Sequence, residues 1–170
     1  MAEYQRGKGV VKTKDFTNNA SLNFEPAYSF MGDNEDYIET LNALKSLFPR
    51  AVEDYVRMLF LDTICANPDR HTFNFGILRD ADTGNILGLA PNFDNNMALI
   101  SRGYPKNTNS KNDLLIILFN DLLIYDEKLK NYIPDISEDM IREVIKSVGM
   151  RVKSKYIAEL IMNRYALIDR

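Results

Sequence analysis

The 170-residue chain lacks features that would place it in several classes of protein. Its single cysteine, Cys65, excludes an internal disulfide and a cysteine-rich zinc site, and favours a reducing compartment. The net charge is only -3 and no basic stretch alternates with aromatic residues, so nucleic acid is not an expected partner. The longest apolar run, residues 114–119, is too short to span a bilayer, and the N-terminus has no apolar core of a signal peptide. We therefore expect a cytoplasmic protein without membrane segments.

The composition supplies enough material for one folded domain. Hydrophobic residues make up 45% of the chain and aromatic residues 11%, and the length is that of an ordinary domain. We find no internal repeat, no low-complexity tract and no obvious linker. The sequence therefore predicts a single domain over residues 1–170.

Hydrophobic periodicity predicts a chain that is mainly α-helical. Residues 1–32 have little periodicity and read as loop or short strands. The expected helices run from a cap at Asp33 to Pro49, over 51–65, over 113–124, over 138–148 between Ser137 and Gly149, and over about 152–168. Cys65 ends an apolar helix and is expected in the core, not as a nucleophile.

A small β-hairpin interrupts the helices. Residues 75–78 and 86–89 have strand character, and the turn formers of 79–85 join them. A calcium loop at Asp80, Asp82 and Gly84 is rejected, because its glycine and its last position do not fit. The very polar segment 101–112 is expected to be a mobile loop.

Two loops carry the residues that could perform chemistry. NPDRHTFNFG, residues 67–76, places Asp69 five residues before Asn74, and Asp94 follows the hairpin that returns the chain to the same end. Phosphoryl transfer needs a carboxylate for the proton of the attacking hydroxyl and oxygen ligands for magnesium on the phosphates. We therefore predict that Asp69, Asn74 and Asp94 point into one cleft.

These loops, NPDRHTFNFG and LAPNFDNN, resemble the catalytic and metal-binding loops of HipA-like serine/threonine kinases. The first also resembles the loop of phosphoinositide lipid kinases. The resemblance implies that Asp69 is the catalytic base, that Asn74 and Asp94 hold Mg²⁺ on ATP, and that His71 lies against the nucleotide phosphates or braces the loop. It implies a protein-kinase-like C-lobe (α+β) over about residues 15–170 that phosphorylates a protein on serine or threonine.

The resemblance does not extend to the N-lobe of such a kinase. That lobe carries a glycine-rich loop and a strand lysine, whereas residues 6–12, RGKGVVK, lack a third glycine and the Walker pattern. We expect the N-lobe to be missing and residues 1–170 alone to be inactive. Activity is expected only when upstream sequence, or a partner chain on the exposed face of the lobe, supplies it.

Two other interpretations remain open at this point. Asp69, His71 and Asn74 could form only a hydrogen-bonded turn, as Asp94 and its neighbours could. The chain could then be a non-catalytic binding or regulatory module that keeps the kinase-lobe fold. A magnesium-dependent phosphatase or nuclease is a more distant alternative, because the sequence shows no second carboxylate cluster.

Overall fold

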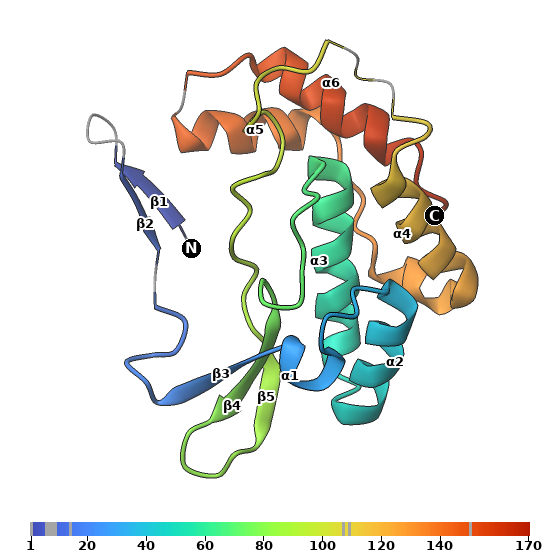
Figure 1. Cartoon of the computed structure of the whole chain (residues 1–170). Helices are drawn as coiled ribbons and strands as arrows, with labels where there is room; N and C mark the ends of the chain where they lie inside the picture. The colour runs from blue at the N-terminus through green and yellow to red at the C-terminus, as the bar shows by residue number, and fades with distance from the viewer. Residues whose placement is uncertain (1, 6–9, 14, 107, 109, 150) are drawn as a thin grey trace.

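Helix α3, Ala51–Cys65, lies at the centre of the computed structural model (Figure 1). The structure describes residues 2–5, 10–13, 15–106, 108, 110–149 and 151–170. Tyr55, Val56 and Leu59 of α3 are buried, in agreement with its predicted apolar character. The helix ends at Ala66, which has a left-handed backbone (φ 52°) and donates its N–H to carbonyls of the last turn. This conformation directs the chain into the loop that contains Asp69.

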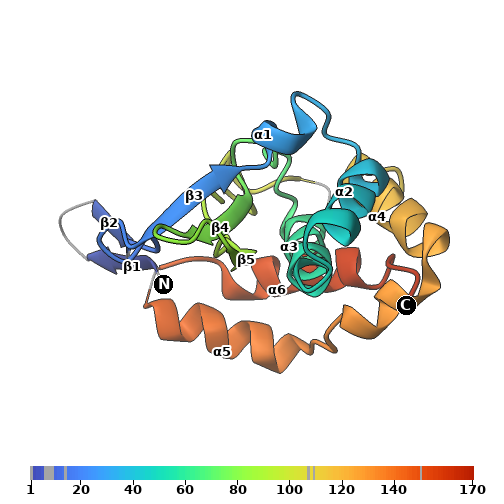
Figure 2. The same ribbon diagram turned by 90° about the horizontal axis from the view of Figure 1, so that it is seen from below.

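Four helical elements pack directly against α3, and a fifth packs outside them. The four are α2 (Tyr37–Leu47), α4 (Leu114–Tyr125), the 3₁₀ helix η1 (Glu127–Tyr132) and α6 (Ser154–Tyr165). Helix α5, Glu138–Val148, lies along α6 (Figure 2). Within the described ranges, no helix has both the length and the apolar character needed to cross a membrane.

The cap of α2 differs from the prediction. Asp36, not Asp33, caps the helix, and its carboxylate accepts a hydrogen bond from the backbone N–H of Glu39. Residues between Asp33 and Asp36 stay out of the helix because the side chain of Asn34 accepts a bond from Asp36 N at 2.9 Å. A short helix, α1 (Tyr28–Met31), precedes this turn.

The predicted boundaries of the C-terminal helices are mostly confirmed. Ser137 caps α5 and Gly149 ends it with a left-handed backbone (φ 68°). Asp113 caps α4. Helix α6 is shorter than the predicted 152–168, because the chain after Tyr165 closes tighter, three-residue turns.

The predicted hairpin is the major part of a three-stranded antiparallel sheet. Its strands are β3 (Leu22–Pro26), β4 (Gly76–Asp80) and β5 (Ile86–Leu89), in the order β3-β4-β5. β3 approaches β4 closely, since a Cβ added at Gly76 would lie 2.1 Å from the carbonyl oxygen of Glu25. Only glycine fits there.

A second, two-stranded hairpin consists of β1 (Ala2–Gln5) and β2 (Val10–Thr13). The segment Gly7-Lys8-Gly9, which the sequence does not support as a phosphate loop, lies outside the described residues.

Candidate active site

The loop after α3 is closed by Asn74. The side-chain amide of Asn74 donates to the carbonyl oxygen of Asp69 at 2.8 Å, and its backbone N–H donates to the carbonyl of His71, also at 2.8 Å. Asn74 is buried, whereas Asp69 is half-buried. The five-residue spacing seen in the sequence is therefore the length of one closed turn, in which the two residues are held together.

Arg70 lies at the centre of this site as a buried ion pair. Its guanidinium contacts the carboxylate of Asp62, a residue of α3, at 2.7 Å, and each side chain is only 2% exposed. A second bond of 2.9 Å joins Nη2 to the other carboxylate oxygen, so the pair is bidentate. Asn67 donates to the same carboxylate at 2.8 Å. Asp62 thus anchors the start of the loop to α3.

The same guanidinium joins the two predicted loops. Nη1 of Arg70 donates to the carbonyl of Asn74 at 2.6 Å and to the carbonyl of Phe93 at 2.9 Å. Nη2 donates to the side-chain oxygens of Asn92 at 2.7 Å and Asn95 at 2.6 Å. Because the two carbonyls accept from one nitrogen, the backbones of the loops lie within a few ångströms of each other.

Asp94 lies between two residues that Arg70 binds. Its backbone is left-handed (φ 54°), a conformation that aspartate tolerates better than most residues. Its carboxylate is exposed and, like that of Asp69, forms no hydrogen bond or ion pair with any described residue. The structure therefore brings the loops of Asp69, Asn74 and Asp94 together. That the three side chains share one cleft stays a prediction.

His71 contacts Phe73 within the same loop. Its Nδ1 accepts a hydrogen bond from the backbone N–H of Phe73 at 3.3 Å, and its ring meets the edge of the Phe73 ring with centroids 6.1 Å apart. Of the two roles implied for His71, this contact corresponds to bracing.

Sequence reasoning missed Arg70 and Asp62, although a signal was present. Asp62 is a charged residue in an otherwise apolar stretch of a helix with buried residues on several sides. A carboxylate in such a place needs a buried cation as partner, because an isolated charge is too costly there.

Three phenylalanines form an aromatic cluster beside Asp94. Phe93 stacks on Phe16 with ring centroids 5.5 Å apart, and Phe24 of β3 meets both rings edge-on, at 5.7 and 5.5 Å. All three are half-buried. They give the loop of Asp94 an apolar neighbour on the side of the sheet.

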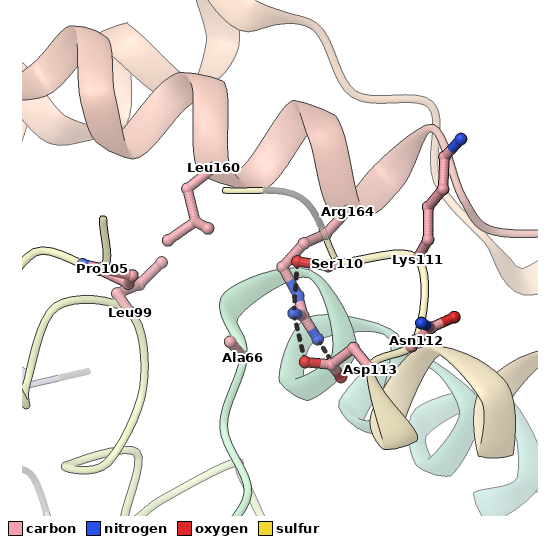
Figure 3. A pocket seen from close by; sticks show the side chains of 9 residues that line it. All are labelled: Ala66, Leu99, Pro105, Ser110, Lys111, Asn112, Asp113, Leu160 and Arg164. Carbon is pink, nitrogen blue, oxygen red and sulfur yellow. Dashed lines mark hydrogen bonds and ion pairs between the residues drawn. The ribbon is translucent and has the colours of Figure 1, made fainter. Parts of the chain in front are cut away.

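A cavity of about 630 Å³ lies between the end of α3, the segment before α4, and α6 (Figure 3). Arg164 on α6 lines it, and its guanidinium donates to the carbonyl of Thr63 at 2.5 Å and to Asp113 at 2.8 and 2.9 Å. Hydrogen bonding to Arg164 holds the pKa of the Asp113 carboxyl below its usual value of 3.8. Arg164 thereby joins α3, α4 and α6.

A smaller hollow of about 350 Å³ shares Ala66, Leu99 and Pro105 with this cavity and reaches Pro68, next to Asp69. The described residues of segment 101–112 contact α6 here: Tyr156 donates its hydroxyl to the carbonyl of Pro105. The predicted mobility of this segment stays a prediction.

Cys65 is half-buried and packs against the hydrophobic core. Burial raises the pKa of its thiol to about 12. A thiol that stays protonated at neutral pH is a poor nucleophile.

Comparison with solved structures finds a likeness of fold. The chain is similar to the crystal structure of the Helicobacter pylori proinflammatory kinase CtkA, with a TM-score of 0.63 and 17% sequence identity over 93% of this chain and 72% of that chain. No protein-family model and no curated protein matches the sequence. The chain therefore has a kinase-like fold, mostly helical with a small antiparallel sheet.

Proposed function

We propose that this chain is the C-lobe of a HipA-like kinase, which transfers the terminal phosphoryl group of ATP to a serine or threonine of a protein. The observation that carries the proposal is the position of Arg70, which binds the backbone of both loops with one guanidinium. A pair of unrelated turns would not require a shared buried cation. The kinase-like fold supports the same conclusion.

In this proposal Asp69 accepts the proton of the attacking hydroxyl. Its carboxylate is half-buried, and no described residue neutralises or hydrogen-bonds it, so the group is available as an acceptor. The side chain of Asn74 holds the carbonyl of Asp69, and His71 stiffens the intervening turn. Positioning of this kind is a large part of what a protein contributes to phosphoryl transfer.

The side-chain oxygens of Asn74 and Asp94 would hold a magnesium ion. Amide and carboxylate oxygens are hard donors of the type that Mg²⁺ prefers. In the described part of the chain, no three histidine, cysteine or acidic side chains gather as a metal site, so affinity would depend on nucleotide phosphates. Bound there, Mg²⁺ would neutralise charge on the phosphates. The Phe16–Phe24–Phe93 cluster would offer the nucleotide base an apolar surface.

The proposal assigns only the C-lobe functions to residues 15–170. A glycine-rich loop and a phosphate-binding lysine would come from a further segment or from a partner chain. Without those contacts the nucleotide is poorly aligned, and each ~1.4 kcal/mol of lost transition-state stabilisation lowers the rate about tenfold. We therefore expect no measurable transfer by residues 1–170 alone.

Titration calorimetry with magnesium and ADP tests the site. We expect Asp94→Asn to weaken binding of the Mg²⁺–ADP complex at least about tenfold, with little effect on ADP in the presence of EDTA. Asp82→Asn is the matched control, because it removes the same charge from the exposed β4–β5 turn. Equal heats for wild type and Asp94→Asn would show that Asp94 is no metal ligand.

A further inference from the structure

Two aromatic side chains stack on the surface, and one of them belongs to the loop of Asp69. Tyr28 begins α1 and Phe73 lies in the loop between Asp69 and Asn74; their ring centroids are 4.5 Å apart and their planes are inclined by only 19°. Tyr28 is 42% exposed and Phe73 52% exposed, and neither belongs to the hydrophobic core cluster. Their stacking therefore leaves a broad apolar area in contact with solvent.

The backbone beneath both rings is fixed. The N–H of Tyr28 donates to the carbonyl of Thr72 at 3.0 Å, and the N–H of Ala27 donates to the carbonyl of Phe75 at 2.9 Å. The N–H of Phe73 bonds to the imidazole of His71. A partner that covered the rings would thus lose little free energy in ordering them, because they are already held in position.

The location of Phe73 favours a protein acceptor over the nucleotide. Phe73 lies in the turn that Asn74 closes onto Asp69, four residues after the residue proposed to receive the hydroxyl proton. Arg70 binds the loop of Asp94 through the carbonyl of Phe93, and the aromatic cluster of Phe93 is the separate apolar surface proposed for the nucleotide base. The exposed pair is therefore free to contact the chain that brings the hydroxyl.

The acidic residues that follow Tyr28 along the chain indicate which kind of protein segment could bind here. Residues 15–44 contain no lysine or arginine. Immediately after α1, Asp33 and Glu35 are exposed, and no described residue forms an ion pair or hydrogen bond with either carboxylate. An apolar pair whose chain continues into unpaired acidic side chains complements a segment that carries both apolar and basic side chains.

We propose that the Tyr28–Phe73 pair binds an apolar side chain of the protein substrate close to the serine or threonine acceptor, and that basic residues of the same substrate segment face Asp33 and Glu35. This inference rests on the proposed kinase function for the identity of the acceptor. It adds a substrate class, namely proteins with an apolar and basic sequence around the acceptor.

A positional-scanning peptide library tests the inference by binding. Each peptide has a central serine, and one flanking position at a time is fixed as leucine, lysine, glutamate or glycine; the fraction captured by the immobilised chain is measured with ADP and magnesium present. We expect wild type to enrich leucine at one or two positions and lysine near them, and to exclude glutamate there. The best peptide should bind Phe73→Ala and Tyr28→Ala about tenfold more weakly, the loss typical of an aromatic anchor.

The variants separate the two parts of the recognition. Phe73→Ala should lose the preference for leucine and keep that for lysine, whereas Asp33→Asn with Glu35→Gln should do the opposite. Leu87→Ala is the matched control, because Leu87 is also 52% exposed but lies on β5. Thermal unfolding of each variant would identify any loss of fold.

Three outcomes would overturn the inference. They are the absence of any leucine enrichment by wild type, an enrichment that Phe73→Ala leaves unchanged, and a loss of ADP binding in Phe73→Ala with peptide selection intact. The last would assign the pair to the nucleotide. Because capture does not use the Asp69 carboxylate, Asp69→Asn should select the same peptides. A failure of phosphoryl transfer is thus distinguishable from a failure of docking.

Discussion

Arg70 and Arg164 are both almost completely buried and both face a carboxylate, but they bind different parts of the molecule. Arg70 holds loops: its partners include the carbonyls of Asn74 and Phe93. Arg164 holds helices, through the carbonyl of Thr63 at the end of α3 and the capping carboxylate of α4. Arg70 therefore fixes the loops of the candidate site, and Arg164 fixes the helices that support those loops.

The solvation of the two carboxylates differs as well. Asp62, opposite Arg70, is 2% exposed, whereas Asp113, opposite Arg164, is 31% exposed. Water can therefore solvate Asp113 if its arginine is lost, but not Asp62. Equal burial of two cations therefore does not imply equal importance for stability, because the cost of removing one depends on whether water can reach the carboxylate that it leaves behind.

The largest effect is expected from Arg70→Met. It leaves the Asp62 carboxylate buried without a cation, so the free energy of unfolding should fall by about 3–5 kcal/mol. Urea unfolding measures this change. In any fraction that still folds, binding of Mg²⁺–ADP should be lost, because the backbones of the two loops are no longer joined.

The double variant Asp62→Leu, Arg70→Met is the control for this prediction. With both charges of this pair removed, it should be more stable than Arg70→Met alone. Destabilisation equal to the sum of the two single changes would show that the two groups do not interact and would remove the basis of the comparison.

A smaller loss is expected from Arg164→Met. Asp113 can turn to water, so the main cost is the unpaired carbonyl of Thr63 and a weaker join between helices, about 2 kcal/mol. Urea unfolding again gives the value. Binding of Mg²⁺–ADP should stay within about twofold of wild type, and a loss as large as that in Arg70→Met would contradict the separation of the two roles.

Lowering the pH should destabilise the protein by protonating Asp113, the partner of Arg164. Hydrogen bonding to Arg164 lowers the pKa of folded Asp113 below 3.8, so the folded state holds this proton less tightly than the unfolded state. The resulting stability is present above 3.8 and is lost as the pH falls through the folded pKa. As the pH falls below about 4, wild type should therefore lose stability more steeply than Asp113→Asn. Parallel curves for wild type and Asp113→Asn would contradict the prediction.

The smallest effect should come from an exposed arginine. Arg57 pairs with Glu53 one turn away on α3, at 2.7 Å, and both side chains are largely in water. Arg57→Ala should change the free energy of unfolding by at most about 0.5 kcal/mol. Values above 1 kcal/mol in urea unfolding would mean that exposed charges matter here as much as buried ones, and the ranking would fail.

Local signals in the sequence predicted the helical part of the fold well. The limits of α3 and the cap and end of α5 follow from side chains within a few residues, such as Ser137 and Gly149. The strand β3 was foreseen only as part of an irregular opening region, because its partner is β4, where Leu22 faces Asp80. Such pairing depends on contacts far along the chain that periodicity does not report.

The residues of the candidate site were likewise only partly predictable from the sequence. Asp69, Asn74 and Asp94 were proposed from spacing, and the structure brings their loops together without testing their chemical roles. Arg70 stands in the same motif but was not singled out, because its partners include a carboxylate in the preceding helix and carbonyls in a loop some twenty residues later. Only the tertiary structure shows which groups a long, flexible side chain reaches.

Gly76 limits how this protein can vary among related sequences. The atom that a side chain at this position would meet, at 2.1 Å, belongs to the backbone of Glu25, so no change of rotamer relieves the clash. β3 would have to separate from β4, and Phe24 would move away from Phe93 with it. In a saturation scan read out both by soluble expression and by nucleotide binding, Gly76 should therefore tolerate almost no amino acid in either assay. Substitutions at Gly76 would be selected against because they separate the two strands, whether or not the protein is a catalyst.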